Sequence, residues 1–171
     1  MSKGYIHLYT GNGKGKTTAA LGISLRAICS GKKVFFGQFM KGQQYSELKA
    51  QEYLPGLKME QFGGLCFVNE KPREEDITDA KNGLKIMEEI LTSKVYDMVV
   101  FDEINTAVFF GLVTLEEVMA VIKKKPAETE LILTGRYAKE ELIELADLVT
   151  EMKEIKHYYN AGVEARKGIE N

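Results

Sequence analysis

The residues best suited to chemistry form a glycine- and lysine-rich run near the start of the chain, Gly11-Asn12-Gly13-Lys14-Gly15-Lys16-Thr17-Thr18. The run separates an expected strand from an expected helix, which is the context of a phosphate-binding loop. It fits the pattern GxxxxGK[ST] from Gly15 to Thr17, although Thr10 stands at the first glycine position. Its three glycines let backbone N–H groups converge on phosphate oxygens. We predict that this run, called the P-loop below, binds the phosphates of a nucleotide.

Two further groups extend the P-loop toward a complete nucleotide site. Lys16 is the expected cation for the phosphate chain, and the Thr17 hydroxyl is placed to ligate Mg²⁺. The apolar run Val99–Phe101 ends in Asp102 and Glu103, so a buried strand delivers two carboxylates to the sheet edge where ligands of open α/β folds bind. We predict Thr17, Asp102 and Glu103 as metal-binding residues for Mg²⁺ or Mn²⁺. The alternatives are a glycine turn without a ligand and acidic residues that only end a strand.

The composition is that of one ordinary globular domain, which we place at residues 1–171. The chain is 44% hydrophobic and 28% charged, with 23 Lys plus Arg, 25 Asp plus Glu and a formal net charge of −2. Such a balance gives no bulk attraction to nucleic acid or to an anionic membrane, so we expect neither as a partner. No apolar run approaches the roughly 20 residues that cross a bilayer, and Cys29 and Cys66 lack metal-site or disulfide spacing. We expect a cytoplasmic protein.

Short apolar segments alternate with amphipathic ones along the chain, as in parallel α/β folds. The predicted strands are Tyr5–Thr10, Lys33–Phe39, Lys58–Phe62, Asp97–Asp102, Glu130–Thr134 and Asp147–Met152. The predicted helices are Lys16–Cys29, Glu74–Leu91, Thr114–Lys123 and Lys139–Leu145. We therefore predict an α/β fold, a three-layer P-loop NTPase-like (RecA-like) domain with a mostly parallel six-stranded sheet and helices on both faces.

A nucleotide–Mg²⁺ site is shared by kinases, motors, switches and transferases, so the chemistry depends on three further segments. They are Gly37–Gly42, Leu133–Arg136, and a stretch that runs from Glu144–Met152 through Lys156-His157 to Gly162–Glu170. Together with Gly11–Gly22 and Val99–Glu103, they resemble the P-loop family of ATP:corrinoid adenosyltransferases, which act on cob(I)alamin or cob(I)yrinic acid a,c-diamide. The resemblance keeps the same order along nearly the whole chain.

This resemblance implies transfer of the 5′-deoxyadenosyl group of ATP to the Co(I) centre of a reduced corrinoid, with release of triphosphate, in adenosylcobalamin biosynthesis or salvage. It also implies a reductase that supplies Co(I), and a homodimer. Because Co(I) is a strong nucleophile without a proton, the reaction needs no general base. The protein must hold C5′ in line with the metal and stabilise charge on the leaving triphosphate. We predict Lys16, Thr17 and Glu103 as the catalytic residues.

Further candidate contacts lie on segments that match the family. Lys41 and Arg136 follow strand ends, where they are expected to contact phosphate or corrinoid amides. The alternative for both is an exposed charge or a hydrogen bond that fixes a loop. Phe62 and Phe67 are candidates for an apolar wall over the corrinoid, and ordinary core packing is their alternative.

One departure from the family pattern leaves other functions open. In relatives we expect aromatic residues where this chain has Cys66 and Val68. A nucleotide-dependent protein that binds or carries a corrinoid is therefore one alternative, and a small-molecule kinase is a less favoured one. Their products differ: the transferase yields triphosphate and an adenosyl–cobalt bond, the kinase yields ADP, and the carrier yields neither.

Overall fold

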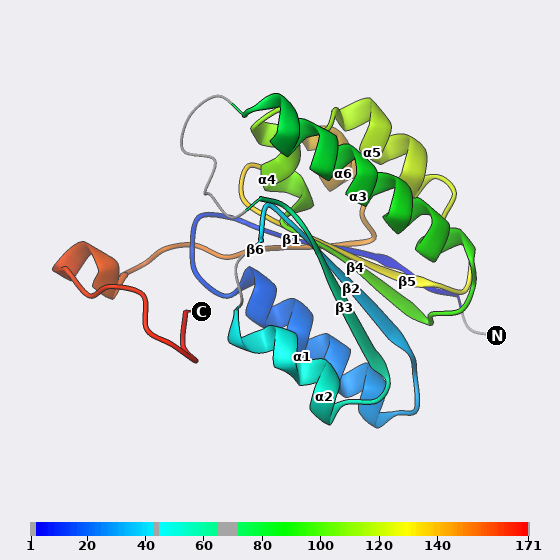
Figure 1. The fold of residues 1–171 in the computed structure, drawn as a ribbon, viewed down its shortest axis with the longest axis horizontal. Coiled ribbons are helices and arrows are strands. Elements are labelled where there is room, and N and C mark those ends of the chain that lie inside the picture. Colours follow the sequence, from blue (N-terminus) through cyan, green and yellow to red (C-terminus); the bar gives the residue numbers. More distant parts are fainter. Residues whose placement is uncertain (1–2, 43–44, 65–71, 171) are drawn as a thin grey trace.

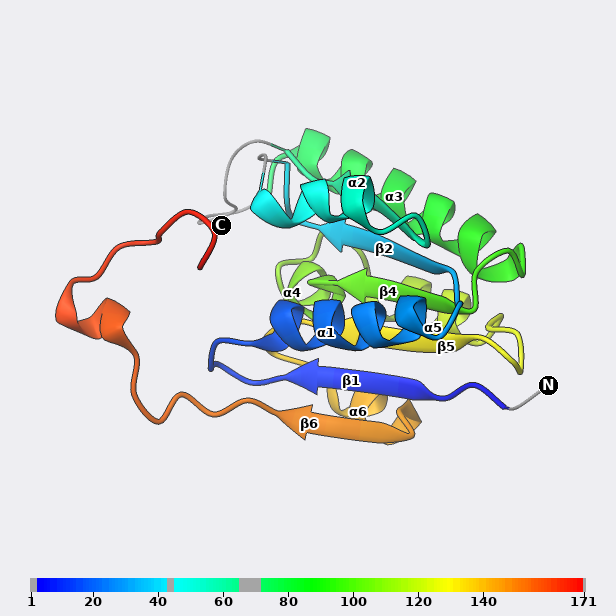
Figure 2. The same cartoon turned by 90° about the horizontal axis from the view of Figure 1, so that it is seen from below.

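Six parallel strands form one sheet at the centre of the protein. The structure, a computed structural model, describes residues 3–42, 45–64 and 72–170. The strands are β1 (Ile6–Thr10), β2 (Val34–Phe39), β3 (Leu57–Phe62), β4 (Met98–Asp102), β5 (Glu130–Thr134) and β6 (Leu148–Glu151). Their order across the sheet is β3-β2-β4-β5-β1-β6, and every neighbouring pair is parallel. All six carboxyl ends therefore share one edge, on the left in Figure 2.

Helices cover both faces of this sheet (Figure 1). One face carries α1 (Lys16–Cys29) and the short elements η1 (Ser46–Lys49) and α2 (Ala50–Tyr53). The other face carries α3 (Glu74–Thr92), α4 (Ile104–Phe109), α5 (Leu115–Ile122) and α6 (Glu140–Leu145). Successive residues of β4 join opposite cores, since Val99 and Phe101 pack on the α3 side whereas Met98 and Val100 pack on the α1 side. A strand covered on both faces needs apolar residues at consecutive positions, which β4 has.

The predicted fold class is confirmed, and the sheet is parallel throughout. All six predicted strands and all four predicted helices occur within one residue of their expected bounds. The sequence prediction missed η1, α2, α4 and η2 (Tyr158–Ala161). Each of these elements has four to six residues, which is too short for helical periodicity to repeat.

Phe62, at the end of β3, lies in the core between the sheet and α3. It is 8% exposed, and its ring centroid lies 5.6 Å from that of Phe39. A Cβ added to Gly83 of α3 would lie 2.4 Å from the Phe62 Cβ, so glycine is what permits this close approach. The core-packing alternative for Phe62 is therefore the one that the structure shows. Phe67 and the segment Cys66–Val68 lie outside the described residues.

The chain leaves the sheet after β6, which is an edge strand beside β1. Residues 152–170, called the C-terminal segment below, run out from the carboxyl edge of the sheet and then turn back toward it (Figures 1 and 2). Gly162 and Gly168 lie in this segment with φ of 85° and 76°, values that favour glycine. Most of its side chains are exposed, so polar contacts rather than a hydrophobic core must position it.

Candidate nucleotide site

The P-loop connects β1 to α1 at the carboxyl edge of the sheet. Gly11 and Gly15 have φ of 95° and 124°, so both adopt backbone conformations that other residues rarely use. Gly15 is the N-cap of α1, and the helix begins at Lys16. The N-terminal N–H groups of α1 and the positive end of its dipole therefore lie at the loop, an arrangement that favours a bound anion.

Lys16 is folded back onto the P-loop. Its Nζ donates hydrogen bonds of 2.8 Å to the carbonyl oxygens of Gly11 and Gly13, and the residue is only 6% exposed. Burial lowers the pKa of the Lys16 ammonium, and the opposing charge of Glu103 does not offset this effect. A phosphate would replace two neutral acceptors by a charged one, which forms stronger hydrogen bonds. The geometry therefore suits a cation that changes partners when an anion enters.

Asp102, the last residue of β4, is the buried centre of the site. Its side chain is fully buried, and Oδ1 accepts hydrogen bonds from the hydroxyls of Thr17 (3.0 Å) and Thr134 (2.6 Å). Oδ2 accepts from Lys41 Nζ (3.0 Å) and from Gln38 Nε2 (3.2 Å). A buried carboxylate needs such partners because its desolvation is costly. The structure thus brings the predicted pair Thr17 and Asp102 into direct contact.

Lys41 bridges two acids instead of projecting freely beyond the end of β2. Its Nζ lies 3.0 Å from Asp102 Oδ2 and 3.5 Å from Glu47 Oε1. Burial by itself would lower the pKa of the Lys41 ammonium, but the charges of Asp102 and Glu47 prevail and raise it. The ammonium also lies 5.3 Å from the ring centroid of Tyr45. In the free protein, Lys41 is therefore a charged member of the hydrogen-bonded group around Asp102. We call this group, which also contains Thr17, Thr134 and Gln38, the Asp102 cluster.

Glu103 follows Asp102 in an unusual backbone conformation. It has φ of 60° as the N-cap of α4, and a non-glycine residue in this region is typical of a constrained or functional site. Its backbone N–H donates to Thr134 Oγ1 (2.9 Å), and its carboxylate accepts a hydrogen bond from Thr106. Burial, and then the charge of Asp102, raises the pKa of the Glu103 carboxyl.

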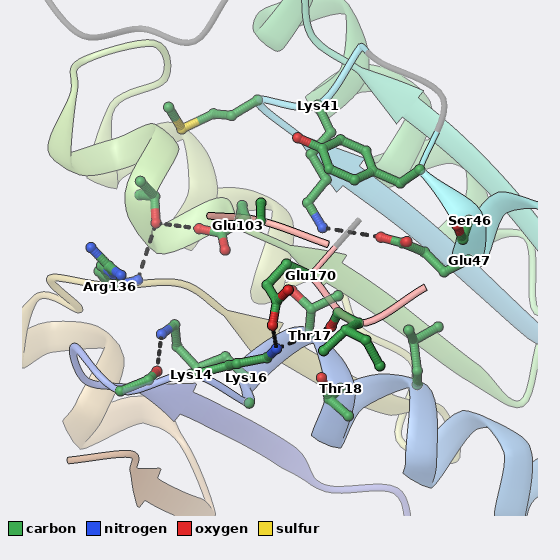
Figure 3. A pocket seen from close by; sticks show the side chains of 18 of the residues that line it. Lys14, Lys16, Thr17, Thr18, Lys41, Ser46, Glu47, Glu103, Arg136 and Glu170 are labelled. Carbon is green, nitrogen blue, oxygen red and sulfur yellow. Dashed lines mark hydrogen bonds and ion pairs between the residues drawn. The ribbon is translucent and has the colours of Figure 1, made fainter. Parts of the chain in front are cut away.

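The loop after β5 is joined to Glu103 through Thr106. The backbone N–H of Arg136 donates to Thr106 Oγ1 (3.1 Å), and Gly135 has φ of 130°. A Cβ on Gly135 would lie 2.8 Å from Thr106 Oγ1, so this turn requires glycine. The Arg136 side chain is thereby held at the rim of the site, as Figure 3 shows.

These elements surround a pocket of about 970 Å³. This volume is near the upper end of the roughly 300–1,000 Å³ of small-molecule sites. The lining residues come from the P-loop and α1 (Gly13, Lys14, Gly15, Lys16, Thr17, Thr18, Leu21), the region after β2 (Met40, Lys41, Tyr45, Ser46, Glu47), α4 and its N-cap (Glu103, Thr106, Phe110), the turn after β5 (Arg136, Tyr137) and the C-terminal segment (His157, Ala165, Gly168, Ile169, Glu170).

Most predicted site residues thus lie together, but a few do not. Four of those that the structure describes are not among the lining residues: Gly11, Asn12, Phe62 and Asp102. Of these, Gly11 accepts a hydrogen bond from Lys16, and Asp102 accepts one from Thr17. Sequence reasoning missed Glu47 of η1 and Tyr45, its N-cap residue, because a four-residue element shows no helical periodicity. It also missed the role of Glu170 in the pocket, although the segment that contains it had been singled out.

The donor set at Asp102 suits Mg²⁺ bound together with a nucleotide. Thr17, Asp102 and Glu103 offer oxygen atoms, which are the ligands that Mg²⁺ prefers. Among the described residues, no three His, Cys, Asp or Glu side chains form a cluster that would hold an ion by itself. Mg²⁺ commonly relies on one or two protein carboxylates together with phosphate oxygens and water, so the residues present fit that mode.

Comparison with known proteins gives the family. Residues 2–171 match the family described as ATP:corrinoid adenosyltransferase BtuR/CobO/CobP. The chain is 34% identical over 168 residues to a corrinoid adenosyltransferase of Escherichia coli K12, covering 98% of this chain and 86% of the relative. It is 37% identical over 178 residues to a corrinoid adenosyltransferase of a Sinorhizobium species, covering 98% and 80%.

A solved structure supports the fold. The flagellar accessory protein FlaH of Methanocaldococcus jannaschii superposes with a TM-score of 0.59 at 12% identity, covering 88% of this chain and 72% of that chain. At this identity the likeness concerns the fold alone. The full-length family match and the two relatives above 30% identity carry the assignment, and they show that this chain belongs to the ATP:corrinoid adenosyltransferases, a family of enzymes.

Proposed function

We propose that this protein transfers the 5′-deoxyadenosyl group of ATP to the Co(I) centre of a reduced corrinoid and releases triphosphate. The observation that carries the proposal is the pocket itself, which is lined both by the P-loop and by aromatic side chains. The P-loop side offers Lys16, Thr17 and the buried Asp102 cluster to a polyphosphate. Phe110 and Tyr137 line the same pocket and offer apolar surface to a flat ligand.

In the proposed reaction, the cobalt electron pair forms the Co–C5′ bond while the C5′–O5′ bond breaks and its electrons leave with the triphosphate. Lys16 supplies positive charge to that leaving group, together with the N–H groups of the P-loop. Thr17, Asp102 and Glu103 would hold Mg²⁺, which when bound neutralises phosphate charge. Proton transfer is not needed, because the nucleophile carries no proton.

An exposed aromatic stack lies beside the pocket, and one of its two rings, that of Tyr137, lines the pocket. The ring centroids of Phe109 and Tyr137 lie 4.1 Å apart, and the rings make an interplanar angle of 29°. The two residues are nevertheless 48% and 43% exposed. Phe110 contacts the edge of the same stack. Tyr137 also has φ of 59°, a region that non-glycine residues rarely adopt. We assign this surface to one face of the corrin ring, with Phe67 retained as a further candidate for the wall.

The proposal includes partners that follow from the chemistry. A reductase has to supply Co(I). A homodimer remains an expectation from the family resemblance, and a cytoplasmic location remains an expectation from the sequence composition. Within the described part of the chain, no helix has the length and apolar character needed to cross a membrane. We also retain the corrinoid carrier as the alternative function and the small-molecule kinase as a less favoured one.

Product analysis tests the proposal directly. The protein is incubated with ATP, Mg²⁺ and a corrinoid under a strong reductant, and the corrinoid spectrum and phosphate species are followed together. An adenosyl–cobalt spectrum with equimolar triphosphate supports the transferase. ADP would instead indicate a kinase, and binding of both ligands without turnover would indicate a carrier. Lys16→Ala serves as the matched control, because it removes the P-loop cation from the same fold.

A further inference from the structure

Polar groups from the P-loop and from the C-terminal segment converge on one carboxylate, that of Glu170. Lys14 Nζ lies 2.6 Å from Glu170 Oε1, and the Tyr158 hydroxyl donates to the same oxygen. Arg166 donates from its backbone N–H (2.8 Å) and Nε (3.2 Å) to Oε2, and from Nη2 (3.2 Å) to Oε1. We call these four residues the Glu170 cluster. One anion is thus surrounded by an ammonium, a guanidinium, a hydroxyl and a backbone N–H.

The Glu170 cluster lies at the nucleotide pocket. Lys14 and Glu170 both line it, and Figure 3 shows their side chains meeting within it. Lys14 precedes Gly15 and Lys16 in the P-loop, and its Nζ also donates to the Ile169 carbonyl (3.0 Å). A cation of the phosphate-binding loop is therefore paired with an acid that lies 156 residues later in the chain.

The donors of this cluster suit a phosphate better than they suit a carboxylate. Arg and Lys are the usual side chains for phosphate recognition, and Arg presents a planar fork of donors. Arg166, then Lys14 and Tyr158, hold the pKa of the Glu170 carboxyl well below its usual range, so the group is charged at neutral pH. The Lys14 and Arg166 side chains are 37% and 52% exposed, although that of Glu170 is only 15% exposed. Ion pairs with cations that water still reaches contribute little, so a stronger anion can replace this carboxylate.

We propose that Lys14, Arg166 and Tyr158 form an anion subsite for a phosphate group of the ligand, which Glu170 fills in the free protein. Glu170 is then a competitor of ATP and of the triphosphate product, and it lowers the affinity of the pocket for both. A weaker hold on triphosphate favours its release after transfer. The inference rests on the proposed function only for the identity of these ligands.

Calorimetric titration of the full chain with inorganic triphosphate, and separately with ATP, tests the subsite in the absence of corrinoid. Glu170→Gln keeps the side-chain shape and removes the competing charge. We expect it to tighten the binding of both ligands roughly two- to fivefold, the scale of a charge pair near the protein surface. Adenosine has no phosphate and should bind to both proteins equally.

A matched control separates local competition from overall charge. Glu164→Gln removes the same charge from the same segment, and Glu164 makes no hydrogen bond or ion pair within the part of the chain that the structure describes. It should leave triphosphate affinity unchanged. Lys14→Met should weaken triphosphate binding and reduce the gain from Glu170→Gln, because Lys14 is one of the three donors that Glu170 occupies. Thermal unfolding of each variant establishes that it is folded.

The idea is overturned if Glu170→Gln binds triphosphate as weakly as the parent protein or more weakly. It is also overturned if Glu164→Gln shows the same gain, or if Lys14→Met leaves the triphosphate affinity unchanged. Adenosylation of a corrinoid is measured separately, so that failure of the anion subsite can be told from failure of the proposed transfer. Tighter triphosphate binding without an adenosyl–cobalt product would refute the proposed transfer alone, whereas transfer with unchanged binding would refute the subsite alone.

Discussion

Replacing Asp102 by Asn tests whether the buried cluster is organised around a carboxylate. In the structure, Asp102 accepts hydrogen bonds at Oδ1 from Thr17 and Thr134 and at Oδ2 from Lys41 and Gln38. Asparagine keeps one acceptor oxygen but presents an NH₂ group where the second oxygen was. The Lys41 and Gln38 donors then face the NH₂ group, which is itself a donor. The Lys41 ammonium keeps only the more distant Glu47, at 3.5 Å, as its acidic partner in this cluster.

The expected loss of unfolding free energy follows from the burial of the Asp102–Lys41 ion pair. Removing one partner of a buried ion pair costs about 3–5 kcal/mol. Because the Lys41 side chain remains 15% exposed and retains Glu47, we place Asp102→Asn near the lower end, at about 3 kcal/mol of unfolding free energy. Lys41→Met should cost only about 1–2 kcal/mol, because three hydrogen-bond donors to Asp102 remain.

Urea denaturation of the two single variants and of the double variant checks this asymmetry. The double variant Asp102→Asn/Lys41→Met should be more stable than Asp102→Asn alone, since it no longer buries an ammonium without its main partner. A loss below about 1 kcal/mol for Asp102→Asn would refute the account. Additive losses in the double variant would also refute it, because they would mean that the two residues do not interact.

Three further predictions concern the P-loop, the core and the metal. Lys16→Ala should abolish adenosyl transfer while the far-ultraviolet circular dichroism spectrum stays unchanged; retained turnover would contradict the role of the P-loop. Gly83→Ala should destabilise the protein by about 1–3 kcal/mol in thermal unfolding, because its Cβ would meet that of Phe62, whereas Gly22→Ala, with open space in α1, should stabilise it by about 0.5–1 kcal/mol. Chelation of Mg²⁺ should weaken ATP binding about tenfold or more in calorimetry, and unchanged affinity would argue against the metal.

The fold was predictable because its signals are local. The apolar run Val99–Phe101 and the helical spacing within Glu74–Thr92 each specify an element by themselves. The P-loop was equally plain, since its residues are contiguous. The elements that escaped prediction, such as α4, are short and take their helical form from the turn at Glu103 and from packing against the sheet.

The partners within the site were less predictable, because they depend on the sheet register. Gln38 reaches Asp102 since the two residues are paired across β2 and β4, and no single-sequence pattern specifies that pairing. Lys41 was expected to contact phosphate or the corrinoid, yet in the free protein its ammonium lies between Asp102 and Glu47. The missing information was the position of Glu47, which comes from a four-residue 3₁₀ helix.

Each of three lysines in the pocket is paired with an acceptor that belongs to the protein itself. These pairs explain how an acidic protein can select a polyanion. Lys14 pairs with Glu170, Lys16 with two P-loop carbonyls, and Lys41 with Asp102 and Glu47. Binding is therefore an exchange of partners and not a simple addition of charge, so its free energy is a difference between two sets of contacts. A weak or singly charged anion gains little in that exchange, whereas a triphosphate can replace several partners at once. Selectivity for a polyphosphate thus follows from the exchange of these lysine partners for phosphate oxygens, even though the chain carries a formal net charge of −2.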